Sequence, residues 1–353
     1  MATTNATSER KQESTQASTR VLVVAPAWVG DMVMCQPLLQ LIKAQQPNSF
    51  VQVVAPKATA PVATRMAEVD EVTVAEFEHG KLGWSARREL GHQLRGLKFD
   101  VAYVLPNSWK SALLPWFANV KRRVGWLGES RYGLLNDARR LDKQAYPLMI
   151  ERFMALADID GQLPTKPYPL PQLTFDLQNR TQLLEQLNLQ PKQVAVLCPG
   201  AEFGAAKKWP VAHYSQLAED LLQAGYQVWL MGSSKDAEDA QAIQQVVPQA
   251  INLAGKTSLV DAIDLMSCAE LVVSNDSGLM HVGCALNIAT VGVFGSTSPG
   301  FTPPLGPRAE VVELEMDCRP CFKRECPLQH LNCLNQLQPA QVMRSVEKLK
   351  RVQ

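Results

Sequence analysis

"VLVVAPAWVGDMVMCQPLLQLI", residues 21–42, is the stretch from which the fold can be inferred. Its first five residues are apolar on consecutive positions, which is typical of a strand buried on both faces of a parallel sheet. Gly30 and Asp31 follow, and then an apolar-rich segment long enough for a helix. A carboxylate at a strand-to-helix junction has two interpretations. Asp31 is either a helix cap in a turn or a functional group placed beyond the carboxyl end of a strand.

The same strand-then-helix pattern recurs along the chain. Short apolar runs at 21–25, 51–55 and 101–105 form one set, and runs at 194–198, 228–232, 271–275 and 290–295 form another. Strands that alternate with helices predict a doubly wound α/β fold. The segment between the sets, "GQLPTKPYPLPQLTF", contains four prolines, which do not fit inside a helix or a central strand. We therefore predict a disordered tail over 1–19, a first Rossmann-like domain over 20–160, a linker over 161–175, and a second Rossmann-like domain over 176–353, the two domains facing a central cleft.

The composition is that of an ordinary soluble globular protein. The chain has 353 residues, is 46% hydrophobic and 20% charged, and carries a formal net charge of +1. This charge gives no reason to expect a nucleic-acid partner. The polar first nineteen residues contain no apolar core of a secretory signal, and no 18-residue apolar run without charges is present. We expect a cytoplasmic protein with reduced cysteines.

A candidate phosphate site lies in "LVVSNDSGLMHVGCAL", residues 271–286. A strand ends, Asn275 to Gly278 turn, and a helix begins. Asp276 or Ser277 could simply cap that helix. The alternative is that the exposed amides and the positive end of the helix dipole bind a phosphate, which Gly278 allows to approach closely. His281, about one turn into the helix, could reach the same ligand.

A second candidate loop, "CPGAEFGAAKKWP" at 198–210, also follows a strand. Gly200 and Gly204 make it flexible, and Pro210 is suited to the first turn of the next helix. Lys207 at this position could bind a diphosphate. The alternative is that Lys207 and Lys208 are two solvated surface lysines.

Residues 109–143 hold eight Lys/Arg against three Asp/Glu, with three tryptophans interleaved. The segment is either a solvated basic surface with core aromatics or a platform for an anionic substrate or an anionic membrane surface.

Four cysteines lie within sixteen residues, in the pattern Cys318-x2-Cys321-x4-Cys326-x6-Cys333. This spacing is typical of a tetrahedral four-thiolate site for zinc or iron, which we expect to be structural rather than catalytic. His330 could replace one ligand. The alternative is four reduced thiols in a packed loop.

Taken together, these motifs resemble the bacterial lipopolysaccharide heptosyltransferases, in particular their type II members. The strings that carry the resemblance are "PAWVGDMVMCQPL", "LPNSWKSALLPWFA", "RYGLLNDARRLDK", "PGAEFGAAKKWP", "NDSGLMHVGCAL" and "SPGFTPPL", which span residues 26–305. The resemblance implies a GT-B fold and inverting transfer of L-glycero-D-manno-heptose from ADP-heptose to heptosyl-Kdo2-lipid A. It also implies a peripheral protein that acts at the cytoplasmic face of the inner membrane and needs no metal for catalysis.

The resemblance also assigns roles to residues. Asp31 matches the catalytic base and Lys207 the lysine that contacts the donor phosphates. The other matched donor-binding positions are Gly200, Ala201, Glu202, Met231, Gly232, Asp276, Ser277, Gly278 and His281, with the adenosine expected near Met231 and Gly232. We assign the acceptor to Gly30, Asn107, Lys110 and Arg131. The cysteine segment occurs in only some relatives, so we do not expect heptose transfer to need it.

Two other functions remain open from the sequence. One is heptosyltransferase I or another ADP-heptose-dependent GT-B transferase, including one that modifies proteins. The other is a non-enzymatic sugar-nucleotide or metal-binding protein, which would leave Asp31 without a role.

Overall fold

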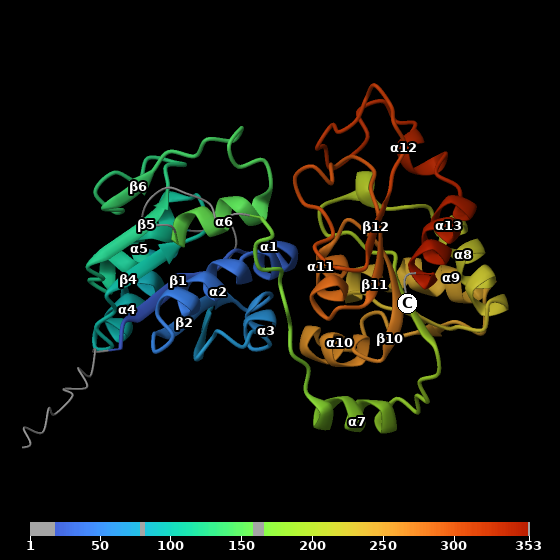
Figure 1. Cartoon of the computed structure of the whole chain (residues 1–353), viewed down its shortest axis with the longest axis horizontal. Helices are drawn as coiled ribbons and strands as arrows, with labels where there is room; N and C mark the ends of the chain where they lie inside the picture. The colour runs from blue at the N-terminus through green and yellow to red at the C-terminus, as the bar shows by residue number, and fades with distance from the viewer. Residues whose placement is uncertain (1–17, 78–81, 158–165, 352–353) are drawn as a thin grey trace, which may run out of the picture.

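The computed structural model describes residues 18–77, 82–157 and 166–351. Two lobes lie side by side, and a connecting segment passes between them (Figure 1). We call residues 18–157 the N-terminal lobe and residues 176–351 the C-terminal lobe, within the described ranges. Residues 1–17 of the predicted tail and 161–165 of the predicted linker lie outside them.

The N-terminal lobe is built on a six-stranded parallel sheet with the order β3-β2-β1-β4-β5-β6. Its strands are β1 (Arg20–Val24), β2 (Phe50–Pro56), β3 (Glu71–Ala75), β4 (Val101–Val104), β5 (Arg122–Trp126) and β6 (Asp137–Arg139). Its helices are α1 (Val29–Met34), α2 (Gln36–Gln45), α3 (Ala60–Ala63), α4 (Trp84–Arg95), α5 (Trp109–Phe117) and α6 (Met149–Ala157).

The C-terminal lobe repeats this plan, with a six-stranded parallel sheet in the order β12-β11-β10-β7-β8-β9. Its strands are β7 (Val194–Cys198), β8 (Gln227–Leu230), β9 (Ile251–Asn252), β10 (Ala269–Asn275), β11 (Ala289–Val293) and β12 (Ala309–Val312). Its helices are α7 (Leu177–Gln186), α8 (Val211–Gln223), α9 (Ala237–Val246), α10 (Leu259–Met266), α11 (Gly278–Ala285), α12 (Asn332–Asn335) and α13 (Pro339–Lys350), and 3₁₀ turns cover Ala205–Lys207 and Ser234–Asp236.

The predicted doubly wound α/β class is confirmed, and each predicted strand is present. Five further strands, β3, β5, β6, β9 and β12, were not predicted. Four of these are edge strands, the fifth, β5, lies next to an edge, and all are only two to five residues long. Short strands with one side towards solvent lack the continuous apolar run that identifies a central strand. The exact domain boundaries remain a prediction.

The strand order reverses once in each sheet, between β1 and β4 and between β7 and β10. Ligands of open α/β sheets bind beyond the carboxyl ends of the strands at such a reversal. In the N-terminal lobe, β1 leads to Gly30 and Asp31, and β4 leads to Asn107. In the C-terminal lobe, β7 leads to Lys207 and β10 leads to Asp276. The fold thus places the predicted site residues at its two ligand-binding edges.

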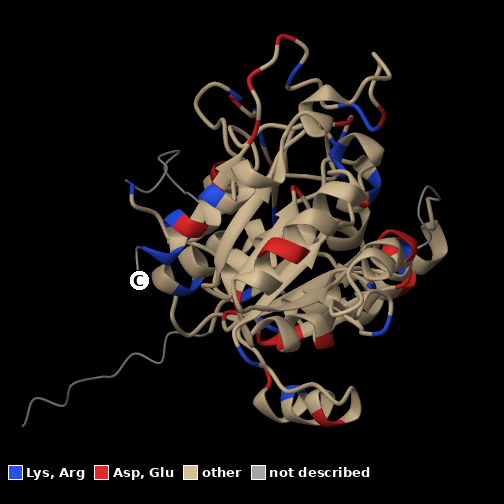
Figure 2. Ribbon diagram, turned by 90° about the vertical axis from the view of Figure 1, so that its right-hand side faces the viewer, with Lys and Arg blue, Asp and Glu red and all other residues tan. Residues whose placement is uncertain are grey.

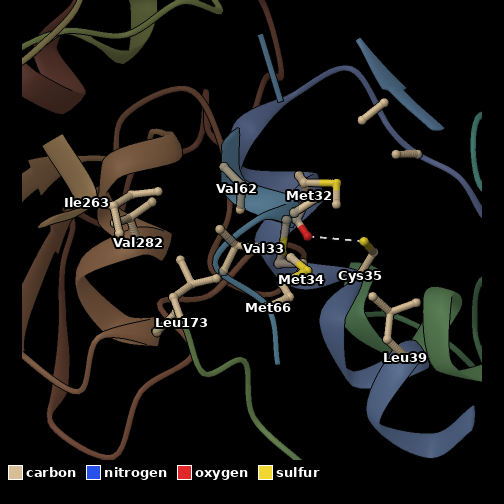
Figure 3. Close-up of a cluster of buried hydrophobic side chains, with 14 of the residues drawn as sticks. Met32, Val33, Met34, Cys35, Leu39, Val62, Met66, Leu173, Ile263 and Val282 are labelled. Carbon is tan, nitrogen blue, oxygen red and sulfur yellow. Dashed lines mark hydrogen bonds between the residues drawn. The ribbon is translucent and has the colours of Figure 1, made fainter. Parts of the chain in front are cut away.

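Buried apolar side chains continue from one lobe into the other. Met32 and Val33 of α1 belong to the same buried cluster as Ile263 of α10 and Val282 of α11. Leu173, from the connecting segment, lies between the two sides (Figure 3). The lobes therefore share an apolar contact that holds α1 next to α11.

The described part of the linker is bound to both lobes. Gln36 and Gln172 are joined twice: Gln36 Nε2 donates to the Gln172 carbonyl at 2.6 Å, and the Gln172 amide donates to Gln36 Oε1 at 2.8 Å. The next amide, of Leu173, donates to the carbonyl of Ala285 in α11 at 2.9 Å. An ion pair between Arg65 and the buried Asp264 of α10 crosses between the lobes nearby.

Candidate active site

The N-terminal ends of α1 and α11 meet where the lobes touch, and a glycine in each helix allows this approach. A Cβ on Gly30 would lie 2.8 Å from Cδ2 of His281, and a Cβ on Gly278 would lie 2.6 Å from Cβ of Val29. Real Cβ atoms do not come this close to other heavy atoms, so a larger residue at either position would push the helices apart. We assigned Gly30 to the acceptor; in the structure, the His281 ring occupies the space next to it.

Asp31 lies in the first turn of α1 and does not cap it. The N-cap residue is Trp28, and no side chain caps the helix. The capping interpretation of Asp31 is therefore wrong, although a carboxylate in the first turn still interacts favourably with the helix dipole. Removal from water raises the pKa of Asp31 to about 6; Lys207 opposes this shift and Asp276 adds to it. The pKa of a general base is well placed near the working pH.

Lys207 is held at the start of α11 by a buried carboxylate. Its Nζ donates to Asp276 Oδ2 at 2.6 Å and to the Asp276 carbonyl at 3.2 Å. The Thr297 hydroxyl donates to the same Oδ2 at 2.6 Å. The solvated interpretation is wrong for Lys207, whose side chain is only 14% exposed. Lys208 turns away and pairs with Asp239 of α9 at 2.7 Å.

The start of α11 has no side-chain cap. Ser277 is the N-cap residue, but its hydroxyl lies 3.1 Å from the Ser274 hydroxyl and bonds no helix amide. The first-turn amides therefore have no side-chain partner within the described part of the chain, which suits an anion. His281 is buried, and its Nδ1 has no partner among the described residues. Burial lowers the pKa of His281 to about 4, so the ring is neutral near pH 7.

The loops after β7 and β8 pack around Asp236, for which no role was predicted. A Cβ on Gly200 would lie 2.2 Å from Asp236 Cγ, and a Cβ on Gly232 would lie 2.9 Å from Asp236 Cβ. The Asp236 carboxylate accepts from the amide and the hydroxyl of Ser233. Both glycines are thus explained by the close approach of two loops, without invoking a ligand.

The remaining predicted donor residues differ in their accessibility. The side chains of Ala201 and Met231 are buried, so only their backbone could face a ligand. Glu202 is exposed and forms an ion pair with Lys235 across the same two loops.

Asn275 also organises the site and was missed. It is fully buried. Its Nδ2 donates to the Pro199 carbonyl at 2.6 Å, and its Oδ1 accepts from the Trp209 amide and the Tyr214 hydroxyl, each at 3.1 Å. Asn275 therefore ties the end of β10 to the loop that carries Lys207. Its position next to Asp276 was the only sequence signal.

Arg131 has a different role from the one we predicted. It is fully buried, and its guanidinium donates to the carbonyls of Pro106 and Trp126. Burial lowers its pKa to about 10. Arg131 therefore supports the loop that carries Asn107 and does not present a charge to an acceptor. Asn107 is exposed and Lys110 is partly exposed, so both can face solvent.

Much of the basic charge of residues 109–143 is used within the protein. Arg122 and Arg139 both pair with Asp137, and Arg123 donates to the carbonyls of Leu134 and Val120. The predicted anionic platform is thus reduced by these contacts. Acidic and basic residues are interspersed over the ribbon (Figure 2).

The four cysteines line one cavity, together with Arg319, His330, Ala206 and Ser296. All are free thiols. Amide hydrogen bonds from Leu331, and then from Leu328, His330 and Gln329, lower the pKa of Cys326 although burial opposes them. Over residues 18–77, 82–157 and 166–351, no three His, Cys, Asp or Glu side chains are grouped to hold a metal ion. The spacing brings the thiols to one cavity, but they do not lie there as a ready ligand set.

Comparisons with known proteins agree with the geometry. A family model described as glycosyltransferase family 9 (heptosyltransferase) matches residues 87–332. Lipopolysaccharide heptosyltransferase 2 of Escherichia coli (strain K12) is 47% identical over 84% of this chain and 88% of its own. The enzyme of the same name from Salmonella typhimurium is 42% identical over 94% and 98%.

A solved structure described as E. coli ADP-heptose lps heptosyltransferase II matches with a TM-score of 0.83 at 41% identity, covering 94% of this chain and 98% of that one. The predicted GT-B arrangement, two Rossmann-like units facing each other, is thereby confirmed.

Proposed function

This chain belongs to glycosyltransferase family 9, the heptosyltransferases, and we propose that it transfers L-glycero-D-manno-heptose from ADP-heptose to heptosyl-Kdo2-lipid A. One observation carries the mechanism: α1, which holds Asp31, packs against the start of α11, where Asp276 binds Lys207, so the charge of Lys207 acts on Asp31. A non-enzymatic sugar-nucleotide protein would need no carboxylate of raised pKa on the side facing the donor residues.

The type II acceptor is supported by the 42–47% identity to relatives named lipopolysaccharide heptosyltransferase 2. The alternative is the acceptor of heptosyltransferase I, or another acceptor used with ADP-heptose. An assay with two defined acceptors, Kdo2-lipid A and heptosyl-Kdo2-lipid A, separates these functions because only the second already carries a heptose.

In the proposed reaction, a hydroxyl oxygen of the acceptor heptose attacks the anomeric carbon of the donor. Asp31 takes the hydroxyl proton as the new C–O bond forms. The bond between the anomeric carbon and the β-phosphate oxygen breaks, and its electron pair leaves with ADP. Lys207 and the uncapped amides at the start of α11 stabilise the charge that grows on the diphosphate. No step is assigned to a metal.

Substrate binding between the lobes would shift α1 relative to α11, because His281 lies against Gly30. The neutral His281 ring, with its free Nδ1, would then meet the donor. Its release from Gly30 would expose Asp31 to the acceptor. Closure around both substrates would exclude water from the reacting centre.

No helix among the described residues is long and apolar enough to cross a membrane. We propose peripheral association with the cytoplasmic face of the inner membrane. Trp84 of α4 and Trp116 of α5 support this: they are 48% and 45% exposed and both contact the Phe117 ring. Exposed tryptophans are typical of surfaces that meet lipid headgroups. Loss of vesicle binding in Trp84→Ser/Trp116→Ser, with unchanged transfer to a delipidated acceptor, would support this surface; unchanged vesicle binding would contradict it.

Mass spectrometry of the acceptor after incubation with ADP-heptose tests the proposed function directly. We expect one added heptose on heptosyl-Kdo2-lipid A and none on Kdo2-lipid A. Addition to Kdo2-lipid A alone would support the type I function, and addition to neither would contradict both.

A further inference from the structure

We propose that Arg319, in the cysteine segment 318–333, is a positioning residue for the donor-diphosphate site. It holds the Gly295–Thr297 turn, which in turn holds Asp276 and Lys207. The inference rests on the proposed function, because it concerns the same diphosphate. It gives the cysteine segment a role in the donor site that does not depend on a metal.

The Arg319 guanidinium is bound on all sides. Nε donates to the Gly295 carbonyl at 2.9 Å, and Nη2 donates to the Thr297 carbonyl at 3.1 Å. Nη1 donates to the Leu314 carbonyl at 2.8 Å, and Nη2 also pairs with Glu313 at 2.6 Å. The side chain is only 7% exposed. A planar fork carries its donors on three nitrogens in fixed directions and can hold carbonyls that lie on different sides of it, whereas the donors of a lysine ammonium all lie on one nitrogen.

The turn held by Arg319 is the one that contacts the lysine site. Thr297 is buried, and its hydroxyl shares Asp276 Oδ2 with Lys207 Nζ. The orientation of the Asp276 carboxylate, and with it the position of the ammonium, therefore depends on where the Thr297 backbone lies. Arg319 fixes that backbone by its hydrogen bond to the Thr297 carbonyl. The Thr297 hydroxyl then bonds Asp276, and Asp276 bonds Lys207.

The backbone of the cysteine segment supports the same loops. The Phe322 amide donates to the Ser296 carbonyl at 2.8 Å, and the Ala206 amide donates to the Arg324 carbonyl at 2.9 Å. Ala206 directly precedes Lys207, and the Ser296 amide donates back to the Ala206 carbonyl at 3.2 Å. Hydrogen bonds thus join three segments into one unit: the loop at 198–210 that carries Lys207, the Gly295–Thr297 turn and the cysteine segment.

Calorimetric titration with ADP and with adenosine tests the role without requiring transfer activity. We expect Arg319→Ala to weaken ADP binding about tenfold, equal to the loss of about one or two hydrogen bonds. Adenosine affinity should stay within about twofold, because the adenosine is expected near Met231 and Gly232, on the far side of β7. Equal loss of both affinities would mean general loosening of the lobe and would overturn the role.

Two further variants separate geometry from charge. Arg319→Lys keeps the charge but cannot reach three carbonyls together, so we expect ADP binding as weak as in Arg319→Ala. Lys323→Ala removes a charge from an exposed position of the same segment and should leave ADP affinity unchanged. Wild-type affinity in Arg319→Lys, or a tenfold loss in Lys323→Ala, would show an electrostatic effect and overturn the positioning role.

A double-mutant cycle with Thr297→Val tests the route to Lys207. If Arg319 acts through Thr297, the two losses of ADP affinity should not add; full additivity would overturn the route. A wild-type chain that does not bind ADP would contradict the proposed function itself. Wild-type binding that Arg319→Ala leaves unchanged would overturn only this inference.

Discussion

The imidazole of His281 lies so close to Gly30 that a Cβ on this glycine would be 2.8 Å from its Cδ2. The two residues come from different lobes and follow strands of different sheets. Each lies near the proposed catalytic groups, since Asp31 follows Gly30, and Asp276, which holds Lys207, directly precedes the helix that carries His281. The contact between the lobes and the proposed chemistry therefore share the same few residues.

We expect Gly30→Ala to lower transfer activity by separating α1 from α11, because the added methyl group cannot share space with the ring. Small-angle scattering of the free protein should show a larger radius of gyration. His281→Ala makes the missing room, so the double variant should regain the compact shape but not the activity. A Gly30→Ala protein with wild-type dimensions and turnover would contradict this account.

Asp31→Asn should keep ADP binding and lose turnover by roughly 10²-fold or more, the scale for a general base. In the wild type, kcat/KM should fall as the pH drops through about 6, because the protonated carboxyl cannot accept the acceptor proton. Near-normal kcat in Asp31→Asn would contradict the catalytic role.

The same substitution should make the protein more stable. The pKa of Asp31 is raised from 3.8 to about 6, so folding favours its protonated form. The contribution of protonated Asp31 to the stability of the wild type is therefore fully present below pH 3.8 and is lost as the pH rises through about 6. Asp31→Asn avoids this loss and should gain up to ~3 kcal/mol at neutral pH, but nothing at pH 3.5. Urea unfolding at both pH values measures the difference, and a gain that does not depend on pH would contradict it.

Lys207→Ala should weaken ADP binding at least tenfold and lower kcat by about 10²–10³-fold, because it removes the charge that faces the leaving diphosphate. Lys208→Ala is the matched control. Its ammonium pairs with Asp239 on α9, so its loss should change neither quantity beyond about twofold. Equal effects of the two variants would mean that only the summed charge of the loop matters.

Arg131→Lys should lower the free energy of unfolding by about 2–4 kcal/mol, because the buried carbonyls of Pro106 and Trp126 lose partners. The acceptor KM should change only as far as this loss of stability disturbs the loop that carries Asn107. Lys110→Ala should show the opposite pattern, with a higher acceptor KM and stability within ~0.5 kcal/mol of the wild type. A stable Arg131→Lys variant with a raised acceptor KM would restore the direct acceptor role.

Elemental analysis tests the four-thiolate prediction, which comes from the cysteine spacing. Protein purified without chelator should contain about one zinc or iron per chain if side-chain rotation gathers the thiols around an ion. Less than ~0.2 metal per chain would contradict the prediction.

The sequence was sufficient for the architecture because buried parallel strands have continuous apolar runs, and a doubly wound fold places function after strands. Asp31, Lys207 and Asp276 could be found on this basis. Arg131 could not be assigned correctly, because the sequence does not distinguish a buried arginine that donates to carbonyls from one that binds phosphate. Asn275, Asp236 and Thr297 were missed for a related reason. Asn275 bonds Pro199, 76 residues away, and Thr297 bonds Asp276, 21 residues away. Asp236 packs against Gly200, which follows a different strand. No local pattern records such contacts.

The linker has a practical consequence for exchanging lobes between relatives. Three successive linker amides donate alternately: Gln172 to Gln36 in the N-terminal lobe, Leu173 to Ala285 in the C-terminal lobe, and Thr174 to Arg65 in the N-terminal lobe. A Gly-Ser spacer of equal length would keep the lobes covalently connected but would lose the side-chain and packing contacts that fix these alternating hydrogen bonds. A chimaera should therefore take the linker and both of its docking surfaces from a single parent, because the linker is part of the contact between the lobes as well as their covalent connection.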